Sequence, residues 1–246
     1  MKSEVWVGGA VHRREKFKVV HVGNSFVKQG TQAMLKLRRS RFSESQFMEV
    51  SQPQYAEILA DQYKIKSKVN FMYTVSKDIV LFEDIWANMA NIKKFSPDFV
   101  LVNIGSNDLA ELNHSSWRSG VRELVENCIR FAAAFDKGVT VAFLEVIPRI
   151  KFEGDLMPNG FERRAKLFND LLWAEQGKAL RQRTNLRFGK IQGLRNKYNS
   201  NGEHKKRNIE EFLADGVHPN FEMYRGIFAK SIRKAILGGK NAPARQ

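Results

Sequence analysis

The chain has 246 residues, 43% of them hydrophobic and 18 of them phenylalanine, so it can fill one large core without a disulfide or a metal to hold it. The single cysteine, Cys128, excludes an intramolecular disulfide, and no apolar run is long enough for a signal peptide or a membrane span. The 41 Lys and Arg against 26 Asp and Glu give a formal net charge of +15, which suggests an anionic partner, although a solvated basic surface explains it equally well. We expect a soluble intracellular protein, cytoplasmic or nuclear, with Cys128 buried.

After a basic lead-in at residues 1–15, apolar stretches alternate with amphipathic ones along the chain. Continuous Val-, Ile- and Phe-rich runs are typical of strands buried on both faces, and apolar residues three and four apart are typical of helices. Strands are expected at 17–22, 69–75, 99–104, 139–147 and 186–191, helices at 26–37, 55–63, 79–92, 118–135, 161–183 and 222–237, and a charged loop at 199–208. This alternation predicts a parallel sheet in a three-layer α/β/α domain over residues 16–238, followed by a basic tail at 239–246.

The first predicted strand ends in Gly23-Asn24-Ser25, where the chain turns directly into a helix. This turn places the serine hydroxyl at the carboxyl end of the sheet, beside the backbone N–H groups of the first helical turn. Ligands bind at this edge in open α/β sheets, so Ser25 is a candidate nucleophile. The alternative is that Ser25 only caps the helix, because serine is a favoured N-cap residue.

Two further polar stretches fall at loop positions of the same architecture. Gly105-Ser106-Asn107-Asp108 comes directly after the third predicted strand, and Asp215-Gly216-Val217-His218-Pro219-Asn220 precedes the last helix. Taken alone, each has an ordinary structural explanation: an Asx turn at the end of a strand for the first, and a capping or surface histidine for the second. Three such stretches in this order are harder to explain in that way.

Acyl transfer needs a hydroxyl nucleophile, an imidazole to accept its proton, a carboxylate to hold the imidazole, and donors for the oxyanion. Ser25 fills the first role and His218 the second. Asp215, about one turn before the histidine, can reach its Nδ1–H, and the side-chain amide of Asn107 can donate to the oxyanion. The sequence therefore predicts a Ser-His-Asp triad with an asparagine oxyanion donor.

Together these stretches resemble the signature of the SGNH, or GDSL-type, hydrolases: Gly-x-Ser after strand one, Gly-x-Asn-Asp after strand three and Asp-x-x-His-Pro near the C-terminus. The resemblance covers residues 16–237. It implies a flavodoxin-like five-stranded sheet of order 2-1-3-4-5, which brings Ser25 and Asn107 to one crevice. It also implies esterase, acetylhydrolase, lipase or thioesterase activity without a metal or organic cofactor, and supporting roles for Asn24, Gly105 and Asp108.

Two positions depart from the family pattern. Asn24 stands where the family usually has a supportive aspartate, and residues 73–77 after the second strand lack the glycine whose N–H is an oxyanion donor. The N–H of Ser76 can serve instead, beside the Ser25 N–H and the Asn107 amide, unless that loop needs a positive φ at which serine is strained. Loss of one such donor typically costs ~10²–10³ in rate.

The leading hypothesis is a serine esterase acting on a small acyl ester, with acetate as the expected acid. The alternative is a weak or inactive binding module of the same fold that holds nucleic acid or an anionic surface, since domains of this family also occur in proteins encoded by some retroelements. If the basic residues converge on one face, we expect weak, sequence-independent binding to phosphate. They gather at Lys36–Arg41, Arg181–Lys197 and Lys205–Arg207, and at Lys230, Arg233 and Lys234 of the final helix.

Overall fold

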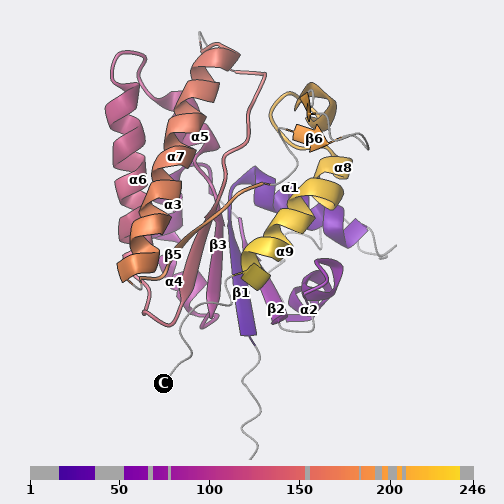
Figure 1. Ribbon diagram of the computed structural model, residues 1–246. Coiled ribbons are helices and arrows are strands. Elements are labelled where there is room, and N and C mark those ends of the chain that lie inside the picture. The colour runs from indigo at the N-terminus through magenta and orange to yellow at the C-terminus, as the bar shows by residue number, and fades with distance from the viewer. Residues whose placement is uncertain are drawn as a thin grey trace, which may run out of the picture.

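In the computed structural model, a five-stranded parallel sheet of order β2-β1-β3-β4-β5 lies at the centre of the described residues (Figure 1). Its strands are β1 (Phe17–Gly23), β2 (Val69–Val75), β3 (Phe99–Asn103), β4 (Thr140–Leu144) and β5 (Leu186–Gly189). The structure describes residues 17–36, 53–65, 69–76, 79–152, 156–182, 184–191, 196–198, 204–206 and 209–238. The predicted fold class and strand order are confirmed.

Helices cover both faces of the sheet, as its continuous apolar strands require. Along β1, neighbouring residues point to opposite faces, so Val19 and Val20 belong to two different apolar clusters. The helices are α1 (Ser25–Lys36), α2 (Pro53–Gln62), α3 (Phe82–Ala87), α4 (Met89–Lys93), α5 (Ser106–Glu111), α6 (Trp117–Ala133), α7 (Pro158–Gln182), α8 (Phe221–Met223) and α9 (Ala229–Gly238). The Val20 cluster packs against α3 to α7, and the Val19 cluster packs against α1, α2 and the last helix.

The prediction of one helix over residues 79–92 is wrong, because this stretch forms two short helices, α3 and α4, that meet at Asn88. One carboxylate oxygen of Asp84 accepts the backbone N–H groups of Val80 and Leu81, each at 2.8 Å. Leu81 is held in an extended conformation, and the helix therefore starts only at Phe82. The side-chain amide of Asn88 donates to the Asp84 carbonyl at 2.9 Å, where α3 ends.

Shorter features were also not predicted from the sequence. The stretch after β3, for which an Asx turn was the alternative explanation, forms the first turn of α5. Part of the loop expected at 199–208 is strand β7 (His204–Lys206), which pairs antiparallel with β6 (Asn196–Tyr198). A 3-10 turn, η2 (Ile209–Phe212), follows, and a π-helical turn, η3 (Tyr224–Phe228), connects α8 to α9 in the last helix.

Cys128 is buried in α6 as expected, and burial raises the pKa of its thiol. The predicted lead-in (1–15), the tail (239–246) and most of the basic cluster at 36–41 lie outside the described residues. Within the described part of the chain, none of the helices has the length and apolarity needed to cross a membrane.

Candidate active site

The turn from β1 into α1 is tight because β1 and β3 approach closely at its end. A Cβ atom on Gly23 would lie 2.1 Å from the Asn103 carbonyl oxygen, so only glycine permits this pairing. The side-chain oxygen of Asn24 accepts the backbone N–H of Phe26 at 3.1 Å and thereby caps α1. Since Asn24 provides the cap, the hydroxyl of Ser25 is left to make a different contact.

That contact is with His218, which lies 193 residues further along the chain. The Ser25 Oγ and the His218 Nε2 are 2.7 Å apart, and the His218 Nδ1 lies 2.7 Å from one carboxylate oxygen of Asp215. The other oxygen of Asp215 accepts the backbone N–H groups of Val217 at 2.9 Å and of His218 at 2.7 Å. One continuous chain of hydrogen bonds therefore joins the serine hydroxyl, the imidazole and the carboxylate.

The charge of Asp215 sets the proton arrangement in this chain. Burial by itself raises the pKa of the carboxyl, but the hydrogen bonds from His218 and Val217 outweigh it and lower the pKa to about 2. The carboxylate is thus ionised at neutral pH and favours the His218 tautomer that carries its proton on Nδ1. The Nε2 of that tautomer is an acceptor aimed at the Ser25 hydroxyl.

Asn107 lies in the first turn of α5, after Gly105, whose φ of 103° is in the region that favours glycine. Its side-chain Nδ2 donates to the Val80 carbonyl at 3.1 Å, and its Oδ1 lies 3.4 Å from an Arg149 nitrogen. The Val80 carbonyl needs a donor and the Arg149 guanidinium needs an acceptor, so these two neighbours determine where the amide nitrogen and the amide oxygen lie. The second N–H of the amide has no partner within the described ranges and can donate to an incoming oxygen. Within the described residues, no hydrogen bond joins Asn107 to Ser25 or His218.

Ser76 follows β2 directly and is half-buried. Among the described residues, a positive φ occurs outside glycine only at Lys64 and Ser96. The strain considered for a serine at this position therefore does not arise. The role of the Ser76 N–H as an oxyanion donor stays a prediction.

Asp108 connects the Asn107 turn to α3. One of its carboxylate oxygens accepts the backbone N–H of Phe82 at 2.8 Å, whereas the other is buried and has no partner among the described residues. Burial raises the pKa of this carboxyl to about 6, against the lowering effect of the Phe82 hydrogen bond. Asp108 therefore holds the turn by a structural contact.

Arg149 is the residue near this site that sequence reasoning missed. Its guanidinium donates to the Ser106 carbonyl at 3.2 Å and lies beside the Asn107 amide oxygen. The ring centroids of Phe152 and Phe161 are each 5.7 Å from the guanidinium carbon. The available signal was its place just after the fourth predicted strand, because the carboxyl ends of parallel strands share one edge of the sheet.

The segment that carries Arg149 also reaches the histidine loop. The backbone N–H groups of Ile150 and Lys151 donate to the Gly216 carbonyl at 2.9 and 3.1 Å. Gly216 has a φ of 84°, and a Cβ there would lie 2.8 Å from the Lys151 Cβ. Residues 149–151 therefore connect the Asn107 turn with the loop between Asp215 and His218. In the described part of the chain, no group of three His, Cys, Asp or Glu side chains is placed to hold a metal ion.

No protein-family model matches this chain, and no curated protein matches it in sequence. Solved structures do resemble it over nearly its whole length. A protein predicted to be an acylhydrolase, from Bacteroides fragilis, superposes with a TM-score of 0.54 at 16% identity, over 92% of this chain and 88% of that one. The acetylxylan esterase Axe2 from Geobacillus stearothermophilus superposes with a TM-score of 0.53 at 17% identity, over 89% of this chain and 94% of that one.

A lipase/acylhydrolase from Enterococcus faecalis gives a TM-score of 0.52 at 14% identity, over 89% of this chain and 96% of that one. This chain has the SGNH-hydrolase fold. At these identities the likeness concerns the fold, and the chemistry is argued from the chain's own residues.

Proposed function

We propose that the protein is a carboxylic ester hydrolase of the SGNH type, acting on an ester of a small acid such as acetate. One observation carries this proposal: the hydroxyl of Ser25, the imidazole of His218 and the carboxylate of Asp215 form a chain with both links at 2.7 Å. The fold is shared with solved acylhydrolases and acetylxylan esterases, which agrees with ester hydrolysis.

The proposed reaction has two halves. His218 Nε2 takes the proton of the Ser25 hydroxyl while the Oγ attacks the ester carbonyl, and the Asp215 carboxylate stabilises the imidazolium that results. The tetrahedral intermediate collapses, and the alcohol leaves with the proton from His218. A water molecule, deprotonated by His218, then attacks the acyl-serine, releases the carboxylic acid and restores the serine hydroxyl.

The negative charge on the tetrahedral oxygen is proposed to be stabilised from three directions. The N–H of Ser25 begins α1, where the aligned peptide dipoles favour an anion. The second N–H of the Asn107 amide and the N–H of Ser76 are the other donors. The contacts of Asn107 with Val80 and Arg149 support its role, because a donor held in place before the reaction needs no reorganisation when charge develops.

The decisive test is the substitution Ser25→Ala, assayed by hydrolysis of p-nitrophenyl acetate and by fluorophosphonate labelling of the unmodified chain. We expect hydrolysis to fall by at least ~10⁴-fold, and the label to be found on the peptide that contains Ser25. Ser119→Ala is a matched control, since the Ser119 hydroxyl, in the first turn of α6, donates to the carbonyl of Ser116 just before the helix. Hydrolysis that survives in Ser25→Ala, or a label on another residue, would contradict the proposal.

The alternative prediction, an inactive binding module, assigns no role to these three residues. A module that only binds has no need of an ionised Asp215 aligned with a histidine and a hydroxyl. The triad geometry therefore favours hydrolysis.

A further inference from the structure

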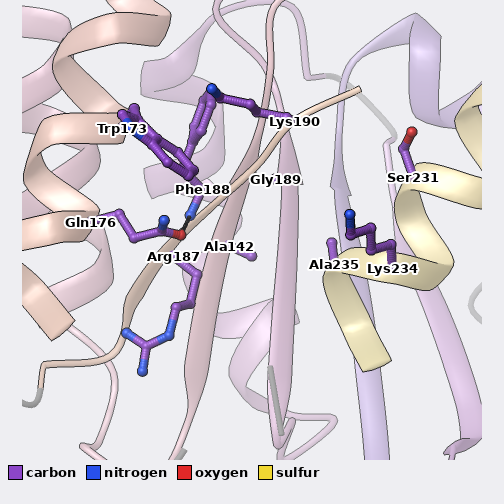
Figure 2. Close-up of a pocket in the computed structure, with 10 residues that line it drawn as sticks. All are labelled: Ala142, Trp173, Gln176, Arg187, Phe188, Gly189, Lys190, Ser231, Lys234 and Ala235. Carbon is purple, nitrogen blue, oxygen red and sulfur yellow. Dashed lines mark hydrogen bonds between the residues drawn. The ribbon is translucent and has the colours of Figure 1, made fainter. Parts of the chain in front are cut away.

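A pocket of about 260 Å³ opens at the β5 edge of the sheet, between α7 and α9 (Figure 2). None of the residues of the proposed active site lines it. Part of its lining is small: Ala142 of β4, Gly189 of β5, and Ser231 and Ala235 of α9. A Cβ on Gly189 would lie 2.9 Å from a Leu144 methyl carbon and 3.3 Å from the Ala235 Cβ, so even one added carbon would crowd this wall.

Three cations from two elements of the fold line the same pocket. Arg187 and Lys190 belong to the β5 segment, and Lys234 extends from α9 on the opposite side (Figure 2). The lining contains no carboxylate, and no Asp or Glu of the described residues forms an ion pair with these three side chains. The fold thus combines two basic clusters that are separate in sequence, which makes this pocket attractive to an anion.

An aromatic side chain lies beside these charges. The indole of Trp173 on α7 is 48% exposed, which is unusual for so large an apolar group in a folded domain. The Lys190 ammonium lies over one face of its ring, 4.2 Å from the centroid, and the Phe188 ring is edge-on to it at 6.3 Å between centroids. These two neighbours hold the indole in place, and its exposed side is suited to stacking against a planar ring.

The lining argues against a lipid. None of the residues that form the pocket is Leu, Ile, Val or Met, and 260 Å³ is small for an acyl chain that is joined to a headgroup. A lipid phosphate would make no use of the exposed ring surface of Trp173. The lining therefore fits a ligand that combines phosphate with a planar ring.

The β5 edge is also closed to an added peptide strand. The N–H of Phe188 donates to the side-chain oxygen of Gln176 at 2.6 Å, and the Leu186 carbonyl accepts from the Arg187 guanidinium at 2.7 Å. These are groups to which a neighbouring strand would have to bond. Among the described residues the Gln176 amide nitrogen makes no hydrogen bond, so its donors can reach a ligand in the pocket.

We infer that this pocket binds a nucleoside phosphate, either as a free nucleotide or as one unit of a single-stranded nucleic acid. Trp173 stacks on the base, and Lys190 and Lys234 bind the phosphate, while Arg187 adds positive charge to the lining. This activity is independent of ester hydrolysis and assigns a site to part of the +15 charge of the chain.

The test uses the full chain and a short fluorescein-labelled single-stranded RNA, titrated by fluorescence anisotropy at about 50 mM salt. We expect the double substitution Lys190→Glu and Lys234→Glu to weaken binding at least about tenfold. The control is the double substitution Lys94→Glu and Lys137→Glu, which changes the net charge by the same amount at exposed positions before β3 and β4. It should weaken binding less than about threefold. Trp173→Ala should weaken it about five- to hundredfold, and Trp173→Phe should restore most of the loss.

Competitors identify the source of the ligand. Displacement by adenosine or uridine monophosphate indicates a free nucleotide, and displacement only by an oligonucleotide indicates a nucleic-acid strand. Equal weakening by the two double substitutions would overturn the inference in favour of bulk charge. The inference would also be overturned if inorganic polyphosphate competed as well as RNA and Trp173→Ala had no effect. Preferential displacement of the labelled RNA by anionic vesicles would overturn it as well. Ser25→Ala should bind the RNA like the unmodified chain, which separates this test from that of the hydrolase.

Discussion

The Ser25–His218–Asp215 half of the candidate site and the half around Asn107 differ in what their functional groups contact. In the first half the reactive atoms bond to one another, at 2.7 Å in each link. In the second half the Asn107 amide bonds to Val80 and Arg149, which belong to the loops that follow β2 and β4. A proton relay can be assembled in the resting protein, whereas an oxyanion donor has no anion to bind and must be held by groups that do not react.

The largest effect that tests this comparison is expected from Asp215→Asn. The asparagine Oδ1 can still accept the N–H groups of Val217 and His218, so the loop should keep its shape. The amide nitrogen would then face His218 Nδ1 and favour the wrong tautomer, so we expect kcat to fall ~10⁴-fold with little change in KM. Steady-state hydrolysis of p-nitrophenyl acetate measures this change.

Asp136→Asn, at an exposed position in the turn before β4, is the matched control and should leave hydrolysis unchanged. The carboxylate of Asp215 should remain ionised in acid, since its pKa is about 2, so it should add no step to the pH–rate profile above about pH 4. Normal hydrolysis in Asp215→Asn would show that the aligned chain is not a working relay.

Asn107→Ala tests the second half of the site directly. Because the amide matters most when charge develops on the carbonyl oxygen, kcat should fall by ~10²–10³ at nearly constant KM. Circular dichroism should show that the fold is retained, as the Asp108 contact with Phe82 still holds α5. A rise in KM at constant kcat would mean that Asn107 only binds substrate.

A smaller effect is expected from Arg149→Met, which removes the hydrogen bonds but keeps much of the length of the side chain. If Arg149 is a positioning residue that acts through Asn107, its loss should lower kcat ~10-fold, the equivalent of about one charged hydrogen bond. The same substitution in an Asn107→Ala background should then change kcat less than about twofold. Equal losses in both backgrounds would indicate a general structural role, and Arg149→Lys measures how much the charge alone restores.

The smallest expected effect concerns stability and not rate. The pKa of Asp108 is about 6 in the folded protein and near 3.8 in an unfolded chain. Between about pH 4 and pH 6 the carboxyl is therefore protonated only when folded, and the free energy of unfolding should decrease by about 2–3 kcal/mol as the pH rises through that window. Below the window the stabilisation is fully present.

Asp108→Asn should remove this pH dependence, since its Oδ1 can still accept the Phe82 N–H. Urea unfolding at about pH 4 and pH 7 measures the difference between the two proteins. Asp136→Asn is the control, because it changes an exposed carboxylate. Asp98→Asn would not serve, because the Asp98 carboxylate accepts the backbone N–H of Lys18. An unchanged pH dependence in Asp108→Asn would mean that the buried carboxyl titrates normally.

Local residue patterns alone determined the class of the fold and the candidate triad. The continuous apolar run from Phe99 to Val102 is typical of a strand buried on both faces, and the alternation of such runs with helical spacing predicts a parallel sheet. Asp215 and His218 are three residues apart, so their contact depends on one short loop. The Gly-x-Ser and Asp-x-x-His-Pro stretches then predicted the triad partners, because parallel strands end at a common edge.

Tertiary structure decided what depends on partners distant in sequence. Asp84 bonds Val80 and Leu81 and so delays the start of α3, which the spacing of apolar residues could not show. The neighbours of the Asn107 amide come from positions 80 and 149, and no periodicity in the chain links them. Lys190 and Lys234 line one pocket only because α9 packs beside β5. Patterns within a segment record which face is buried, whereas the identity of the opposing side chain is set by how the segments pack.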